Sequence, residues 1–169
     1  RITSKKKNED IGYTLDIDGG VLGEVTESPA NDGTRIEVEN LFFNTPARQK
    51  FLKSDKSEEN EITDTVSRLI LGNPTISIKY YINNKILMQS YGDGIEDSII
   101  SVYGSEAITN SFKIQNYVNG VTINGYIGKH NYTKANRSYQ TVILNGRYIS
   151  NQTINSSHSS THLVSIPTL

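Results

Sequence analysis

The sequence predicts an α+β fold, in which short strands and a few helices follow one another irregularly along the chain. Three observations favour this class. Apolar and polar residues alternate in several short runs, which is the period of a half-buried strand. One longer run places Ile62, Val66, Leu69 and Ile70 at helical spacing. Asn-Gly and Asn-Asn pairs between runs are typical of tight hairpin turns.

The chain is expected to begin with a hairpin and a further strand. Residues 13–16 and 21–25 flank Gly19-Gly20, where glycine tolerates the positive φ of a tight turn. After a turn-rich stretch, Ile36 and Val38 alternate with charged neighbours, which predicts a strand that continues through Val38.

Two helices are expected next. Pro46 suits the first position of a short helix, because its missing N–H is not needed there, and Thr45 can cap this helix with its hydroxyl. The short helix is predicted to run through Leu52. A second helix has capping residues at 55–58 and carries the apolar spacing described above, and it is expected to end before Pro74.

A second hairpin precedes the predicted domain boundary. Residues 76–82 alternate, and Asn83-Asn84 can turn the chain back into residues 86–91. Gly92-Asp93-Gly94 is then the best candidate for a linker. The predicted domains are residues 1–92 and 93–169.

The part after the linker predicts one short helix followed by strands. The helix is expected at residues 95–103 and stops at Gly104. The strands are expected at residues 111–118, 121–127 and 139–144, with turns at Asn119-Gly120 and Asn145-Gly146. Residues 151–169 show no clear period, so no structure is assigned to this tail.

Composition excludes several classes of protein. Hydrophobic residues make up 35 % and charged residues 21 %, which suits a folded soluble protein better than a disordered one. No run approaches the ~20 apolar residues that span a bilayer, so no membrane partner is expected. The absence of Cys excludes disulfide scaffolds, thiolate zinc sites and Cys nucleophiles. A cytosolic location is the default expectation.

Charge is distributed unevenly along the sequence. All 18 acidic residues lie at or before Glu106. The bases that follow are Lys113, Lys129, Lys134, Arg137 and Arg147. A segment of one sign suits a polyanion such as nucleic acid, although a chance shortage of surface carboxylates explains it equally well.

Catalytic and metal sites are not indicated. No nucleophile, base and orienting group stand in a recognisable arrangement. His158 and His162 are four residues apart, but no third ligand or HExxH pattern accompanies them, so no metal site is predicted. The loop at residues 92–94 lacks the third Gly and the Lys of phosphate-binding loops.

The informative stretch is residues 33–53, GTRIEVENLFFNTPARQKFLK. It resembles the signature of the MutL-type DNA mismatch repair family: a Gly-Thr step, an alternating strand, Leu-Phe-x-Asn-x-Pro-Ala-Arg and Lys-Phe-Leu. Tyr103-Gly104 and Asn145-Gly146-Arg147 follow in the order that the family shows. The resemblance covers about residues 1–150.

The resemblance implies a fold and a set of site residues. The family belongs to the GHKL ATPases, in which helices over a sheet hold ATP. Residues 1–92 would be the C-terminal part of that domain, and residues 93–169 an incomplete transducer domain resembling a ribosomal protein. Gly33 and Thr34 would be the last nucleotide-binding residues, with the Thr34 hydroxyl close to the adenine. A turn glycine followed by a strand-starting Thr is the structural alternative. Asn44, Pro46, Ala47 and Arg48 would form a structural motif.

Other family motifs are not present in this sequence. They are the Mg-binding Asn helix, the Asp-x-Gly adenine site, the Gly-rich lid and the Val-His-Pro-x-Lys loop. The resemblance therefore implies ATP and Mg as cofactors of the full-length parent only. Residues 1–169 alone are expected to be inactive and to need no cofactor.

The resemblance also implies a role and partners. ATP binding in the parent would coordinate mismatch repair, with sequence-independent binding to the DNA backbone through Arg147, Arg137, Lys134 and Lys129. A MutS-type recognition protein and a homodimeric parent are expected. The location would be cytoplasmic in a bacterium or nuclear in a eukaryote. The alternative is a stand-alone nucleic-acid-binding module without an ATPase parent, or, third, a structural or partner-binding domain.

Overall fold

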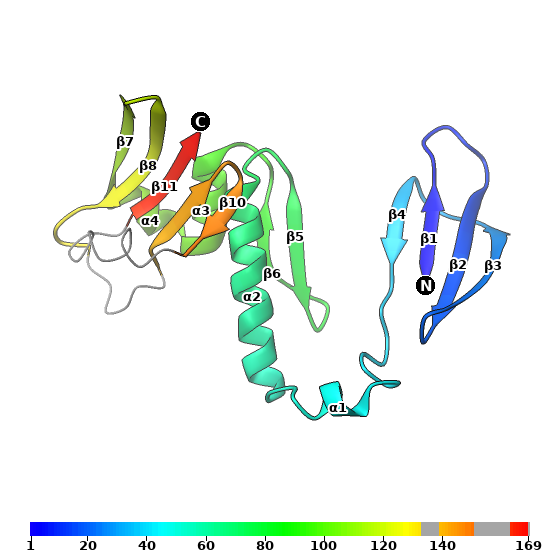
Figure 1. Cartoon of the computed structure of the whole chain (residues 1–169). Helices are drawn as coiled ribbons and strands as arrows, with labels where there is room; N and C mark the ends of the chain where they lie inside the picture. The colour runs from blue at the N-terminus through cyan, green and yellow to red at the C-terminus, as the bar shows by residue number, and fades with distance from the viewer. Residues whose placement is uncertain (133–138, 151–162, 169) are drawn as a thin grey trace. The chain divides into compact units, whose positions relative to one another are not determined.

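The computed structural model describes residues 1–132, 139–150 and 163–168 (Figure 1). The chain divides into two compact units, Arg1–Glu58 and Glu59–Leu169. Both helices and strands are well represented, which confirms the α+β class. Of the helices that the structure describes, none is long and apolar enough to cross a membrane.

The first unit contains a four-stranded antiparallel sheet. Its strands are β1 (Ile2–Lys5), β2 (Gly12–Asp18), β3 (Val21–Ser28) and β4 (Gly33–Ile36). They lie in the order β3-β2-β1-β4, so β1 pairs with β2 on one side and with β4 on the other. Strand β1 was not predicted, because a run of four residues is too short to show alternation.

The hairpin of β2 and β3 agrees with its turn residues. Gly19 and Gly20 have φ angles of 58° and 94°, a conformation that glycine adopts without a steric penalty. The register shifts once, between Leu15 and Ile17, which marks a bulge in β2.

Strand β4 is shorter than predicted. It ends at Ile36 and does not continue through Val38. Glu37 is still bonded to Arg1: its N–H donates to the Arg1 carbonyl at 2.9 Å, and its carbonyl accepts from the Arg1 backbone nitrogen at 3.0 Å.

The short helix α1 (Pro46–Gln49) begins at the predicted residue. Two details differ. Thr45 makes no side-chain capping hydrogen bond, and the helix stops before Leu52. After it, the Phe51 N–H donates to the Arg48 carbonyl, so the chain continues as a turn. Phe51 is 86 % exposed, and no buried face holds a longer helix in place.

Helix α2 (Asp55–Gly72) and the hairpin of β5 (Ile78–Ile82) and β6 (Lys85–Ser90) follow as predicted. The helix opens with acidic side chains, which suit the positive end of its dipole. Asn83 and Asn84 turn the hairpin with φ angles of 49° and 63°.

The second unit also holds a five-stranded sheet and two further helices. The helices are α3 (Ile95–Tyr103) and α4 (Ser105–Thr109), and the strands are β7 (Ser111–Val118), β8 (Val121–Gly128), β9 (Thr141–Leu144), β10 (Arg147–Ile149) and β11 (Leu163–Thr168). Their order in the sheet is β10-β9-β11-β8-β7. Strand β11 is parallel to β9 and antiparallel to β8. Neither α4 nor β11 was predicted.

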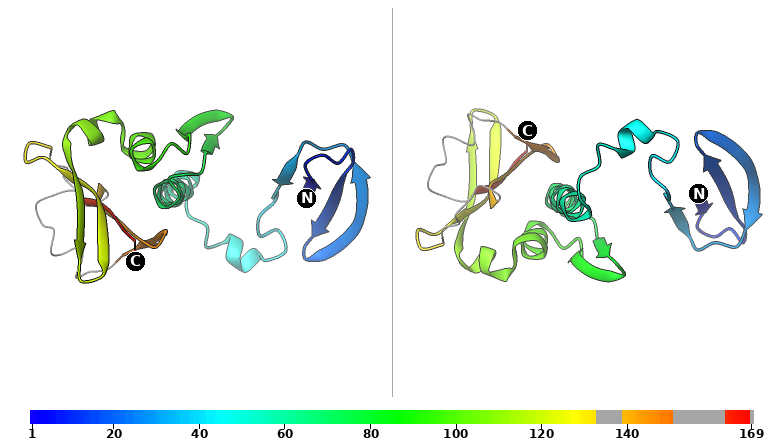
Figure 2. Two further views of the ribbon diagram at one scale, coloured as in Figure 1. Left: turned by 90° about the horizontal axis from the view of Figure 1, so that it is seen from above. Right: turned by 90° about the horizontal axis from the view of Figure 1, so that it is seen from below.

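The core of the second unit lies between its helices and one face of this sheet. Its buried members are Leu71 of α2, Ile99 of α3, Ala107 of α4, Tyr126 of β8 and Ile143 of β9. Figure 2 shows α2 and α3 on the same side of the sheet in both views. The core therefore joins residues on both sides of the predicted linker.

The segment predicted to be a linker is a turn that hydrogen bonds hold in place. The Asp97 carboxylate accepts hydrogen bonds from the N–H groups of Tyr91 and Gly92, at 2.8 and 3.1 Å. The Gly94 N–H donates to the Pro74 carbonyl at 3.0 Å. The domain boundary near residue 92 thus falls inside the second compact unit, and the division of the parent protein into domains stays a prediction.

Candidate functional site

The Gly33-Thr34 step opens β4, and its conformation requires the glycine. Gly33 has a φ of 106°, which strains any L side chain. No atom lies within 4 Å of where its Cβ would be, so the requirement comes from the backbone and not from crowding. Thr34 follows with an exposed side chain, accessible to a ligand.

A second hydroxyl lies beside Thr34. Ser4 on β1 is the register partner of Thr34, and its Oγ is 2.9 Å from the Thr34 Oγ1. The Ser4 hydroxyl also donates to the Gly33 carbonyl at 3.3 Å. Ser4 was not predicted as a site residue, because its partners are 29 and 30 residues away and nothing local marks the position.

The two hydroxyls lie on the apolar face of the sheet. Side chains alternate along a strand, so Ser4 shares its face with Ile2, whose register partners are Leu15 and Ile36. Ile36 is 66 % exposed. This face therefore presents apolar surface with a polar pair at one end, an arrangement that suits a flat, mainly apolar ring with a polar edge.

The opposite face carries a separate chain of hydroxyls. Thr3 Oγ1 lies 3.0 Å from Thr14 Oγ1, and Thr14 Oγ1 lies 2.7 Å from Ser28 Oγ. These groups satisfy one another and do not involve Thr34.

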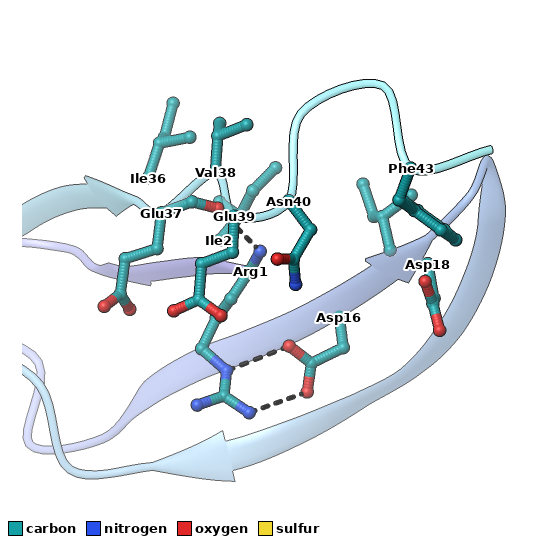
Figure 3. Close-up of a pocket in the computed structure, with 11 residues that line it drawn as sticks. Arg1, Ile2, Asp16, Asp18, Ile36, Glu37, Val38, Glu39, Asn40 and Phe43 are labelled. Carbon is teal, nitrogen blue, oxygen red and sulfur yellow. Dashed lines mark hydrogen bonds and ion pairs between the residues drawn. The ribbon is translucent and has the colours of Figure 1, made fainter. Parts of the chain in front are cut away.

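An acidic hollow of about 640 Å³ borders the sheet (Figure 3). Its charged lining consists of the side chains of Arg1, Asp16, Asp18, Glu37 and Glu39. The Arg1 guanidinium binds Asp16 through two hydrogen bonds, of 2.9 and 3.1 Å, and the hydrogen bond lowers the pKa of this carboxyl. The other carboxylates leave the hollow acidic, so its lining does not suit a phosphate group.

The motif around Pro46 has a structural contact. The Asn44 side-chain amide donates to the Gly19 carbonyl at 3.3 Å, which ties the loop before α1 to the turn between β2 and β3. Ala47 and Arg48 are exposed on α1. Among the residues that the structure describes, none forms a hydrogen bond or ion pair with the Arg48 side chain.

The predicted DNA-binding residues differ in their surroundings. Arg147 begins β10 directly after the Asn145-Gly146 turn, and its side chain is exposed. Lys129 is half-buried, and its ammonium donates to the Thr109 carbonyl at 2.7 Å. Lys134 and Arg137 lie outside the described residues.

The sheet does not bring Lys129 and Arg147 together. Arg147 pairs with Leu144, the last residue of β9. Lys129 lies at the other end of the sheet: it follows β8, past the position that is level with Thr141, the first residue of β9. Six residue steps separate the two rows, which is about 20 Å along the strands. A single short stretch of phosphate backbone does not reach both.

The expected excess of basic charge is also partly neutralised in space. Lys113, which has no acidic neighbour in its own part of the sequence, forms an ion pair of 3.1 Å with Glu96. The Tyr126 hydroxyl donates to the same carboxylate. The hydrogen bond from Tyr126, and then that from Lys113, lowers the pKa of Glu96. Acidic and basic residues are therefore less separated in the folded structure than they are along the sequence.

Metal ligands are not gathered in the part of the chain that the structure describes. No group of three His, Asp or Glu side chains is placed to hold an ion there. His158 and His162 fall outside the described ranges.

Comparison with known proteins points to one family. Residues 99–165 match the family described as DNA mismatch repair protein, C-terminal domain. The DNA mismatch repair protein MutL of Clostridium botulinum (strain Eklund 17B) is 39 % identical over 154 residues, covering 90 % of this chain and 23 % of that protein. The MutL of Clostridium beijerinckii is 40 % identical over the same length, again with 90 % and 23 % coverage. The chain thus spans about a quarter of the length of these relatives.

The fold has a close structural counterpart. The Aquifex aeolicus MutL ATPase domain complexed with ADP matches with a TM-score of 0.82 and 21 % identity, covering 99 % of this chain and 66 % of that one. The match includes the first unit as well as the second, so the likeness in fold extends over both.

Proposed function

This chain belongs to the MutL-type DNA mismatch repair family, and we propose that it forms the part of its parent protein that links nucleotide binding to DNA backbone binding. The first unit contributes to the nucleotide site, and the second carries the contact with DNA. ATP binding favours one arrangement of the parent and so coordinates repair, as a ligand shifts a population toward the state it prefers.

The nucleotide role rests on the exposed Thr34 hydroxyl at the edge of an apolar sheet face. This surface fits the base of ATP better than its phosphates, because the hollow that Gly33 and Thr34 help to line has no excess of positive charge: Asp16, Asp32 and Glu37 line it together with Arg1 and Arg35. The phosphates, and Mg²⁺ with them, are then held by other residues of the parent. The Aquifex aeolicus MutL ATPase domain, which has a similar fold, is complexed with ADP, and this supports the proposed nucleotide role.

The DNA role rests on Arg147, an exposed guanidinium on a firmly placed turn. Gly146 of this turn lies against the end of α2, which fixes the position from which Arg147 projects. A guanidinium presents its donors in a fixed fork that matches phosphate oxygens, and such a contact carries no sequence information. Lys134 and Arg137 are proposed as additional contacts, and Lys129 as a contact with a different stretch of the backbone, because about 20 Å along the strands separates it from Arg147.

The partners follow from the family. We propose a MutS-type recognition protein as the protein partner, a homodimer as the state of the parent, and a cytoplasmic location if the source is a bacterium.

The test of the DNA role is Arg147→Glu in the parent protein. Fluorescence anisotropy with two unrelated duplexes at several salt concentrations should show weaker binding to both, and a log affinity versus log salt slope reduced in magnitude by roughly one. Lys79→Glu is the matched control, an exposed base of the second unit outside the acid-free segment. Unchanged affinity and slope in a folded Arg147→Glu protein would remove Arg147 from the interface.

A further inference from the structure

The hydrogen bonds of the Ser4 hydroxyl determine whether the Thr34 hydroxyl can act as a donor or as an acceptor toward a ligand. A serine hydroxyl has one proton to donate and can accept through its lone pairs. The Gly33 carbonyl can only accept, so the 3.3 Å contact with it takes the Ser4 proton. Ser4 therefore has no proton left for its second contact, and it accepts there: the Thr34 hydroxyl, 2.9 Å away, donates its proton to the Ser4 oxygen.

Because the Thr34 hydroxyl donates its proton to Ser4, it can only accept a hydrogen bond from a ligand. We propose that Ser4 is a positioning residue that holds the Thr34 hydroxyl as a hydrogen-bond acceptor, so that Thr34 selects a nucleobase with an amino group over one with a carbonyl at the same edge. This inference rests on the proposed nucleotide role of Thr34.

Base chemistry makes the consequence specific. Adenine presents an exocyclic amino group, a donor, where guanine presents a carbonyl oxygen, an acceptor. An acceptor-only Thr34 binds the first and leaves the second facing a lone pair. Without Ser4, the Thr34 hydroxyl can rotate to donate, and it then accepts either base.

The arrangement also preorganises Thr34. Ser4 and Thr34 are register partners on adjacent antiparallel strands, so the backbone ladder holds the two side chains next to each other. Ser4 is half-buried, while Thr34 is exposed. The inner hydroxyl thus orients the outer one, and only the outer one reaches a ligand.

The experiment measures affinity for ATP and GTP in the parent protein, by competition of non-hydrolysable analogues against a fluorescent nucleotide. Ser4→Ala should lower the preference for the ATP analogue by about threefold to tenfold, the range of one hydrogen bond. Ser4→Thr keeps a hydroxyl on the strand and should retain the preference. Thr3→Ala is the matched control, because it deletes a cross-strand hydroxyl pair from the adjacent position on the opposite face.

The outcomes separate this inference from the proposed function. The effect of Ser4→Ala should disappear in a Thr34→Ala background, because the two hydroxyls act as one unit. If Thr34→Ala weakens nucleotide binding but Ser4→Ala leaves the preference unchanged, the inference fails and the nucleotide role stands. An equal loss for both nucleotides in Ser4→Ala would show a general structural effect and would also overturn it. If Thr34→Ala has no effect, both proposals fall.

Discussion

Gly72, near the end of α2, lies against the Gly146 carbonyl in the turn between β9 and β10: a Cβ on Gly72 would be 2.9 Å from that oxygen. The contact is between two backbones, so neither side can yield by rotating a side chain. It places the C-terminal end of α2, where Ile70 and Leu71 are buried, directly against the turn that precedes Arg147.

Gly72→Ala should therefore destabilise the protein. Relief of the contact requires a shift of the helix or the turn, at a cost of about 1–3 kcal/mol of unfolding free energy, as for other overpacked sites. Urea denaturation followed by circular dichroism measures it. Asn60→Ala, at an exposed position of the same helix, serves as the control and should change the stability little. Equal stability of Gly72→Ala and the wild type would mean that the turn moves freely.

Two buried serines provide an opposing pair of predictions. Ser98 is 0 % exposed, and its hydroxyl has no hydrogen-bond partner among the residues the structure describes. Ser98→Ala should leave stability unchanged or raise it by up to about 1 kcal/mol, since it removes an unsatisfied buried group.

Ser90 is equally buried, at 1 % exposure, but its hydroxyl is used. It accepts from the Ile78 N–H at 3.2 Å and donates to the Ile76 carbonyl at 3.3 Å. Ser90→Ala should cost about 1–3 kcal/mol, because a backbone donor and acceptor are left in a buried place. The unfolding free energies of the two variants should be measured in one denaturation series. A larger loss of stability for Ser98→Ala than for Ser90→Ala would contradict both predictions.

The Glu96 carboxylate predicts a pH dependence of stability. Its pKa is lowered in the folded state, by the hydrogen bond from Tyr126 first and that from Lys113 second. A group with a depressed folded pKa stabilises the fold above its unfolded pKa of about 4.3, and this contribution is lost as the pH falls through the folded value. The wild type should therefore lose stability over this acidic range.

Glu96→Gln removes the titrating group and should flatten this part of the profile, while stability at neutral pH falls as well. Tyr126→Phe should raise the pKa of Glu96 toward its ordinary value in an NMR titration. Glu106→Gln, on the exposed face of α4, supplies a variant with the same chemical change. If the acid limb of Glu96→Gln overlays that of the wild type, the carboxylate does not contribute to it.

A last prediction concerns activity. Residues 1–169 alone should hydrolyse no ATP above background and bind it weakly, because the family resemblance assigns only Gly33 and Thr34 of this sequence to the nucleotide. A phosphate-release assay tests this. Turnover that Thr34→Ala abolishes in residues 1–169 would contradict it.

The sequence predicted those helices and turns that depend on residues close together in the chain. Helix α3 occupies the predicted residues, and Asn83-Asn84, Asn119-Gly120 and Asn145-Gly146 all adopt the positive φ expected of them. What escaped prediction depends on partners distant in sequence. Strand β11 pairs with β8 and β9, and nothing within its own residues marks it as a strand.

The candidate site shows the same division. The Gly33-Thr34 step could be found from its motif, whereas Ser4 could not, because only the pairing of β1 with β4 brings it to Thr34. The contact of Lys113 with Glu96 likewise joins residues 17 positions apart, so a count of charges along the sequence gave too large an excess.

Strand β11 lies between β8 and β9, so among the described strands it joins the β7–β8 hairpin to the β9–β10 hairpin. During synthesis, the β7–β8 hairpin and the β9–β10 hairpin can each form as soon as their own residues have left the ribosome. Each then waits with an unpaired edge, the kind of surface that invites pairing with another chain. The two edges stay unpaired until residues 163–168 have been made, so slow translation of residues 151–168 would lengthen the period in which they can pair with another chain.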